Sequence, residues 1–351
     1  FDTERVTYGA NLLASWEPDF FGRLRASERG AQARVDAAHA QAVAVRNALL
    51  AEIAGAVIDW RTLDARLAAL AADLASAERL AQLAGSRERA GIAPGFDRVR
   101  AEGASEASRS RIAALGSERA RLVGRLVALT GQPAQRLLNL LAQPAPALAQ
   151  PSAPTALPAQ LLANRPDILA AAAELAAADA ELAASAARRF PQVTLSAALG
   201  LLAFDLASLF DGDSLVGSVG GGFLAPLLDF GRVEAEIDVS AADKKLAFAN
   251  YRETVFTALG EAEAGYGLVT YADAQLSTAT RDFASTARAA KLAQTRYEAG
   301  LSNFLTVLEA RRTADASGER VAIVRGQAER ARVLLWQALG GDQPTSRSNN
   351  Q

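Results

Sequence analysis

The residue types that could do catalytic chemistry form no catalytic constellation in this sequence, since its 39 acidic side chains fall mostly in helical patterns, where they are usually a solvated face. The chain contains one histidine, His39, and no cysteine, so disulfides, thiolate metal sites and cysteine nucleophiles are excluded within it. His39 lies in the alanine-rich helical stretch 37–42 with no cluster of reactive side chains around it, which favours a surface or packed helix residue over a ligand. The glycines at 220–222 lack the following lysine of a phosphate-binding loop. We therefore expect no enzyme activity, no metal and no cofactor.

One group of apolar and charged residues stands out by its spacing. Leu305, Glu309 and Arg312 come soon after Gly300 and are separated by four and three residues, which places them on one helical face within two turns. The plainest interpretation is a packed leucine beside a surface ion pair. The alternative is that the three residues form a functional face. Whether they do depends on where the surrounding helices place that face.

The composition predicts long helices. There are 82 alanines and 3 lysines among 351 residues, and alanine together with Leu, Glu and Arg favours packed helices. The 37 basic and 39 acidic side chains nearly balance, so a nucleic-acid partner is not expected. The apolar runs are interrupted by charges before they reach eighteen residues, so no transmembrane helix is expected.

Two segments of 68 residues without proline, 23–90 and 232–299, predict two very long helices. Each would extend over about 100 Å at the helical rise per residue. Each is followed by a glycine, Gly91 or Gly300, and then by a second, shorter helical pattern. The sequence therefore predicts two long helical hairpins, each with a tight turn at its tip.

The two hairpins are related by an internal repeat with a shift of 209 residues. The sequence FGR at 21–23 returns at 230–232, and the tip glycine Gly91 returns as Gly300. A stripe along the helix is repeated as well: Leu50, Ile53, Val57, Trp60, Asp64 and Leu67 correspond to Leu259, Ala262, Tyr266, Val269, Asp273 and Leu276. Spacings of three and four alternate in both stripes, which predicts coiled-coil packing.

Three short segments show the period-two alternation of β-strands. Apolar residues alternate with mostly polar ones over 6–16, over 192–201 and, more weakly, over 215–223. Each segment is about ten residues long, which is the length that a tilted strand needs to cross a bilayer. A half-buried soluble sheet would show the same alternation. If the strands cross a membrane, several copies of the chain must combine, because a membrane does not tolerate open sheet edges.

The elements divide the chain into seven expected segments. In order, they are a transmembrane strand (1–16), a first helical hairpin (17–142), a proline-rich connector (143–163), a helix (164–190), a transmembrane β-hairpin (191–225), a second helical hairpin (226–341) and a tail (342–351). Pro166 and Asp167 suit the first turn of the helix that follows the connector.

Six motifs in this order resemble the outer membrane efflux protein family, the TolC-like channels of the NodT type. They are EPDFFGRLR at 17–25, NRPDI at 164–168, ARRFPQVTLS at 187–196, PLLDFGR at 226–232, RYEAGLSNFLTVLEARR at 296–312 and ALGG at 338–341. The resemblance implies a homotrimer in which each subunit gives four strands to a shared transmembrane β-barrel and coiled-coil helical hairpins to an α-barrel. Against that pattern, the chain is expected to lack a signal peptide, the first helical segment and the first strand; many members also carry a lipidated N-terminal cysteine.

The resemblance also implies a function. The family provides the outer membrane exit duct of tripartite multidrug efflux pumps, which passes small molecules from an inner-membrane RND pump and a periplasmic adaptor, or membrane fusion, protein to the exterior. Most of the chain would lie in the periplasm and the strands in outer membrane lipid. The two alternatives are an exit duct for type I protein secretion and an elongated coiled-coil scaffold without a channel.

Particular residues acquire roles through the same resemblance. It places Leu305, Glu309 and Arg312 at the constricted periplasmic mouth, with Tyr297 bracing them from the preceding helix. Three-fold symmetry would turn each into a ring, so that the leucines form an apolar constriction and the charges an electrostatic barrier. We expect Arg312 to pair with carboxylates, Glu309 among them, in its own or a neighbouring subunit. The adaptor is expected to contact the helix tips at Gly91, Asp97, Arg98, Arg296 and Gly300.

Overall fold

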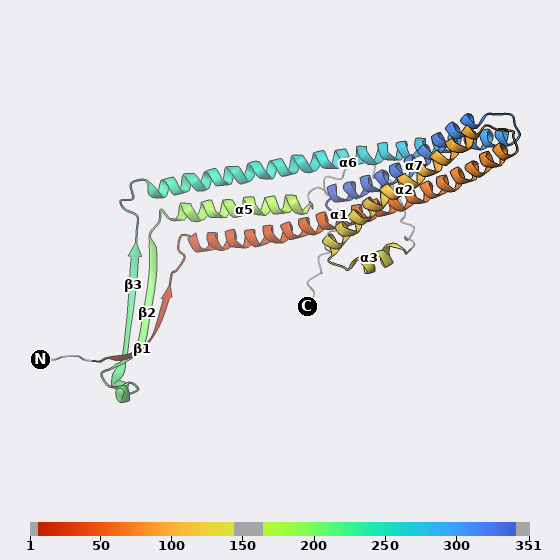
Figure 1. Ribbon diagram of the computed structural model, residues 1–351. Coiled ribbons are helices and arrows are strands. Elements are labelled where there is room, and N and C mark those ends of the chain that lie inside the picture. Colours follow the sequence, from red (N-terminus) through yellow and green to blue (C-terminus); the bar gives the residue numbers. More distant parts are fainter. Residues whose placement is uncertain (1–5, 144–163, 342–351) are drawn as a thin grey trace, which may run out of the picture. The chain divides into compact units, whose positions relative to one another are not determined.

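The computed structural model describes residues 6–143 and 164–341, which form long helices and one small sheet (Figure 1). In chain order the elements are β1 (Tyr8–Trp16), α1 (Arg23–Arg89), α2 (Gly95–Thr130), α3 (Ala134–Leu141), α5 (Pro166–Ala187), β2 (Gln192–Ala203), β3 (Leu215–Leu224), α6 (Arg232–Glu298) and α7 (Phe304–Ala338). The predicted fold class, mainly α with a small β part, is confirmed. Nearly all of the expected connector and tail lies outside the described residues.

The chain divides into two compact units, and the two longest helices contribute to both. The first unit comprises residues 1–41 and 167–255, and the second comprises 42–166 and 256–351. Helices α1 and α6 have 67 residues each. Their ends agree with the long segments without proline in the sequence, because proline inside a helix would remove a backbone hydrogen bond.

The first unit contains an antiparallel sheet in the order β1–β2–β3. Tyr8 lies opposite Ala203, and Val193 lies opposite Phe223. Because residues directly opposite each other share a face of the sheet, this register brings the alternating apolar residues of all three strands, such as Leu12, Leu199 and Val219, to one face. That face is largely exposed; Val219, for example, is 88% exposed.

Polar contacts in the first unit join α5 to the helices on either side of it, α1 and α6 (Figure 1). Arg34 of α1 forms an ion pair with Glu181 of α5, and Lys244 of α6 forms one with Asp179 of α5. Such pairs suit helices whose surfaces are mostly alanine, since alanine offers little apolar area to bury.

Both long helices begin beside an aspartate that caps them. The Arg25 N–H donates to the Asp19 carboxylate at 2.9 Å, and the Val233 N–H donates to the Asp229 carboxylate at 3.0 Å. Because these bonds favour the ionised form, they lower the pKa of both carboxyls. The repeated motif around FGR is therefore explained by its capping aspartate, which stabilises the first turn of the helix that follows.

The second unit packs α2 against α1 and α7 against α6 through small apolar clusters. Leu63 and Leu70 of α1 cluster with Leu115 of α2. In the other hairpin, Val269 of α6 clusters with Leu335 of α7. A small additional helix, α3, packs near the base of the first hairpin.

The repeated stripe is packed in the same way in both halves. Trp60 and its counterpart Val269 are buried, while Asp64 and its counterpart Asp273 are exposed. Asp273 is bound by Arg332 of α7 at 2.7 Å, whereas no ion pair of Asp64 is recorded in the described part of the chain. The duplication therefore preserves the packing of the helix, but the aspartate within the stripe has an ion-pair partner only in the second half among the described residues.

By length and composition, α1 contains a segment apolar enough to cross a membrane. An alanine-rich helix can be apolar on average while carrying a few charges, so α1 meets this criterion without an uninterrupted apolar run, and the expectation of no transmembrane helix stays a prediction. Core helices of soluble proteins meet the same criterion, so this property alone does not place α1 in a bilayer.

Candidate functional site at the hairpin tips

The two hairpins of the second unit turn with the same backbone geometry. Gly91 and Gly300 have φ values of 72° and 74°. At the first tip the Ile92 N–H donates to the Arg87 carbonyl at 3.0 Å, and the second tip has the equivalent hydrogen bond at 2.7 Å. This is a Schellman turn, which satisfies the last carbonyls of a helix and needs a residue that tolerates a left-handed backbone. The structure thus explains the recurrence of glycine at these two positions.

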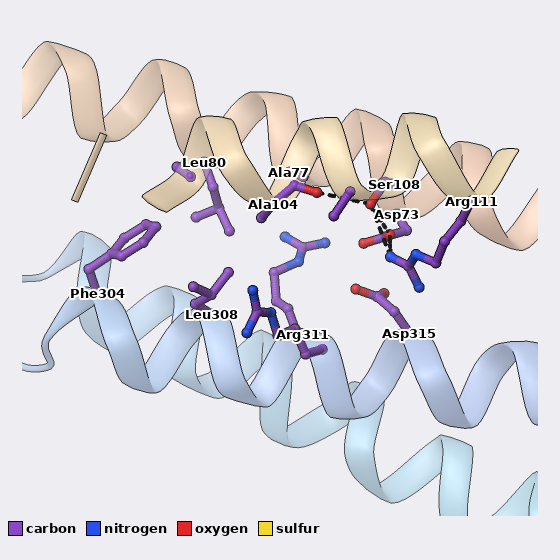
Figure 2. A pocket seen from close by; sticks show the side chains of 13 residues that line it. Asp73, Ala77, Leu80, Ala104, Ser108, Arg111, Phe304, Leu308, Arg311 and Asp315 are labelled. Atoms are coloured by element: carbon purple, nitrogen blue, oxygen red, sulfur yellow. Dashed lines mark hydrogen bonds and ion pairs between the residues drawn. The ribbon is translucent and has the colours of Figure 1, made fainter. Parts of the chain in front are cut away.

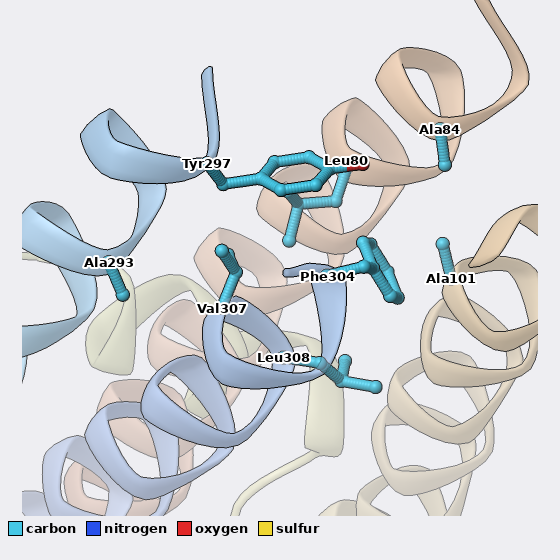
Figure 3. Close-up of a cluster of buried hydrophobic side chains, with 8 residues drawn as sticks. All are labelled: Leu80, Ala84, Ala101, Ala293, Tyr297, Phe304, Val307 and Leu308. Atoms are coloured by element: carbon cyan, nitrogen blue, oxygen red, sulfur yellow. The ribbon is translucent and has the colours of Figure 1, made fainter. Parts of the chain in front are cut away.

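Next to the turns, a buried apolar cluster joins the two hairpins (Figure 3). Its members are Leu80 and Ala84 of α1, Ala101 of α2, Ala293 and Tyr297 of α6, and Phe304, Val307 and Leu308 of α7. The rings of Tyr297 and Phe304 meet edge to face with their centroids 5.8 Å apart, a geometry that aromatic pairs favour. The tips are therefore held together by side chains from all four helices.

Arg87 of α1 adds a polar clamp between the tips. Its guanidinium carbon lies 4.3 Å from the centroid of the Tyr297 ring, which is within cation–π range. Its Nη2 also donates to the carbonyl of Glu298 at 3.3 Å. Tyr297 is only 3% exposed, and its hydroxyl has no hydrogen-bond partner among the described residues. The ring, not the hydroxyl, therefore makes the contacts of Tyr297 within one chain.

The residues predicted to form the constriction share one face of α7, as their spacing indicated. Leu305 is 41% exposed, and Glu309 and Arg312 are not buried either. Across residues 6–143 and 164–341, neither charged side chain has a recorded ion pair or side-chain hydrogen bond. The expected pairing of Arg312 is therefore not made within one chain. Tyr297, predicted to brace these residues from the preceding helix, is buried on α6 with its ring against Phe304 of α7.

The tip charges that were expected to contact a partner differ in how they are held. Arg98 donates to Glu102 and to Glu88, both at 2.7 Å, and these bonds raise the pKa of its guanidinium. Asp97 lies in the first turn of α2 and Arg296 in the last turn of α6, where their charges suit the helix ends. Asp97 and Arg296 form no ion pair with the described residues, so both side chains remain available to another molecule.

A polar cluster behind α7 was not predicted from the sequence (Figure 2). Asp73 of α1 is 8% exposed and accepts hydrogen bonds from Ser108 at 2.5 Å and from Arg111 at 2.7 Å, both on α2. Asp315 of α7 points toward Asp73, and both line a cavity of about 270 Å³. Burial, and next the Asp73 carboxylate, raise the pKa of Asp315 to about 7.

The tips present apolar and charged side chains to their surroundings. In the ranges that the structure describes, no group of three His, Cys, Asp or Glu side chains could hold a metal ion. His39 is exposed on α1 in the first unit, in agreement with a surface helix residue. What the tips offer is a set of apolar and charged side chains on a face that one chain leaves open.

Comparison with known proteins gives a consistent match over most of the chain. The family described as outer membrane efflux protein matches residues 1–132 and 157–341. The chain is similar to the pyoverdine export outer membrane protein OpmQ of Pseudomonas aeruginosa, with 31% identity over 335 residues that cover 95% of this chain and 70% of OpmQ. It is also similar to the toluene efflux pump outer membrane protein TtgF of Pseudomonas putida, with 34% identity over 338 residues that cover 95% and 69%. Nodulation protein T of Rhizobium leguminosarum bv. viciae is 28% identical over 331 residues, which cover 94% and 68%.

Solved structures share the fold at similar identities. A membrane protein from Pseudomonas aeruginosa matches with a TM-score of 0.84 and 27% identity, and the match covers 96% of this chain and 84% of that protein. The outer membrane channel OprN matches with a TM-score of 0.86 and 26% identity, covering 96% and 82%.

Proposed function

The chain belongs to the outer membrane efflux protein family, and from this premise we propose that it assembles as a homotrimer whose channel is closed at the periplasmic hairpin tips. It is an outer membrane protein and an efflux channel. The family assignment confirms the resemblance seen in the sequence motifs. It favours efflux over the two alternatives, a type I secretion duct and a scaffold without a channel.

The sheet supports the trimer. The described residues contribute three strands of 9, 12 and 10 residues, which is long enough for tilted strands to cross the hydrocarbon core. Their shared apolar face suits lipid. Strands β1 and β3 each leave one open edge, and in a bilayer the backbone groups of an open edge have no water to bind. Closure with strands from other copies satisfies both edges.

The decisive experiment is native mass measurement of the full-length protein extracted in detergent. We expect a trimer, and a population of monomers alone would contradict the proposal. Val219→Asp should strongly reduce assembly, because a charge on a lipid-facing strand position costs about 2–4 kcal/mol at mid-membrane, and less for Asp than for Lys or Arg. Ser218→Asp, one residue away on the opposite face of the sheet, is the matched control and should assemble normally.

At the tips, the face of Leu305, Glu309 and Arg312 closes the channel. Three copies around one axis bring like residues together, so the leucines form an apolar constriction and the charges form barriers to ions. Repulsion within each charged ring is offset when Arg312 pairs with carboxylates of a neighbouring subunit, Glu309 among them. This assignment is supported by the exposure of the face and by the absence of partners for its two charges within the described chain.

The partners follow from the same premise. A periplasmic adaptor contacts the tips through Asp97 and Arg296, and through the surface of the turns at Gly91 and Gly300, while an inner-membrane RND pump supplies the cargo. The names of OpmQ and TtgF refer to two different compounds, pyoverdine and toluene. We infer that this duct passes small molecules passively and leaves their selection to the pump. In this role the chain is not an enzyme.

A further inference from the structure

Two aspartates from different helices meet directly behind the proposed gate. Asp315 follows Arg312 by one helical turn on α7, and both side chains line the same cavity. Asp73 approaches from α1 and is held in place by Ser108 and Arg111 of α2. The two facing carboxylates therefore link α7, the helix that carries the proposed gate residues Leu305, Glu309 and Arg312, to the first hairpin (Figure 2).

The pair lies between two cavities. The first cavity, of about 270 Å³, is lined by residues of α1, α2 and α7. The second, of about 290 Å³, is lined by residues of α1, α6 and α7, and both aspartates line it too. Cavities of this size with polar walls can hold water. The two carboxylates therefore border space that can hold water and are not sealed by tight apolar packing.

Four cationic side chains face the pair. They are Arg111 of α2, Lys291 of α6, and Arg311 and Arg312 of α7. Arg111 is committed to Asp73, and Arg311 donates to Gln294 at 3.1 Å. Arg111 and Arg311 favour ionised carboxylates, but burial and the Asp73 charge act more strongly on Asp315. One proton therefore stays on Asp315 in mildly acidic solution, and the protonated carboxyl donates a hydrogen bond to Asp73.

We propose that Asp73 and Asp315 form a proton-dependent latch that holds α7 against the first hairpin and so biases the proposed gate toward its closed state. The latch rests on the proposed channel function. With the proton in place, a hydrogen bond ties α7 to α1. Without it, two carboxylates face each other, and their repulsion favours separation of the helices.

The direction of the pH effect follows from the shift. The pKa of Asp315 is raised from 3.8 to about 7. A group of this kind stabilises the closed contact fully below about pH 4, and its contribution is lost as the pH rises through about 7. Alkaline conditions should therefore loosen the tips, and acidic conditions should tighten them.

The test is the pH dependence of single-channel conductance for the full-length protein in planar bilayers. We expect the wild-type conductance to rise with a midpoint near pH 7, because the ratio of ionised to protonated Asp315 changes about tenfold per pH unit. Asp315→Asn should remove this response and keep the conductance low, since an amide can still donate to Asp73 but cannot ionise. Asp282→Asn is the matched control: it occupies the repeat position of Asp73, lies at the surface in a 3.8 Å ion pair with Arg320, and should leave the midpoint unchanged.

Amide hydrogen exchange provides a readout that does not depend on conduction. Exchange at residues 304–318 should be faster in the wild type than in Asp315→Asn at about pH 8 and equal at about pH 5. Equal exchange at both pH values, or a full pH response in Asp315→Asn, would overturn the latch. Differential exchange in a protein that never conducts would support the latch and refute the channel function instead.

Discussion

The ring and the hydroxyl of Tyr297 should have opposite effects on closure of the tips. Tyr297→Phe keeps the ring contacts with Phe304 and Arg87 and removes a buried hydroxyl without a partner in the described chain. An unsatisfied buried hydroxyl costs about 1–3 kcal/mol. We therefore expect Tyr297→Phe to leave the free energy of tip closure unchanged or to increase it by about 1 kcal/mol.

Tyr297→Leu fills much of the same space but loses both ring contacts. The edge-to-face contact is worth about 1 kcal/mol, and the cation–π contact with a half-exposed arginine about 1 kcal/mol more. The loss of about 2 kcal/mol per subunit corresponds to about a thirty-fold shift from closed to released tips. Channel openings should become correspondingly more frequent.

Hydrogen exchange at residues 296–308 and single-channel recording measure this shift. Tyr271, which is 77% exposed on the same helix, provides the matched control, and its replacement by Phe or Leu should change neither readout. If Tyr297→Phe loosened the tips as much as Tyr297→Leu, the hydroxyl would have a partner in a neighbouring subunit, and the ring would not be the anchor.

Three further outcomes are expected. Leu305→Ser should raise the conductance of the reconstituted channel while His39→Ala should not; unchanged conductance in a correctly assembled Leu305→Ser variant would place the gate elsewhere. Asp97→Asn should weaken binding of the adaptor in pull-down assays, more so at low salt because exposed charges are screened, and salt-independent binding would exclude this contact. Gly326→Ala should lower thermal stability by about 2 kcal/mol, because its Cβ would clash with the hydroxyl of Thr62 on α1. Gly124→Ala, with open space around it, should raise stability by about 1 kcal/mol, and the same sign for both would contradict the packing of α7 on α1.

Short-range rules were sufficient to predict the long helices and the strands of this fold. The two segments without proline indicated the extent of α1 and α6. Gly91 and Gly300 marked the ends of these helices, because each adopts the positive φ of a Schellman turn. Strand alternation likewise identified all three strands. The small helix α3 was missed, although Pro133 before an amphipathic stretch is a helix start that the sequence does contain.

The contacts between helices could not be read in the same way. Asp73 in an alanine-rich helix looks like part of a solvated face, and its neighbour Asp315 is far away in the chain. The sequence predicted that Tyr297 braces the constriction residues from the preceding helix, but it did not indicate that the ring packs against Phe304 and Arg87. Spacing indicates which residues share a face, but only the register between helices decides what that face meets.

The register of the sheet has a consequence for how the protein is made. Tyr8 of β1 pairs with Ala203 of β2, whereas β2 and β3 are joined by a short connection. Strands that are close in sequence pair sooner than strands that are far apart. The β2–β3 hairpin should therefore form while β1 is still unpaired. An unpaired strand in the company of identical chains can add to the wrong edge. Correct assembly should therefore require that β1 is shielded until β2 has been translocated. A high local concentration of newly made chains should increase pairing of β1 with strands of other copies.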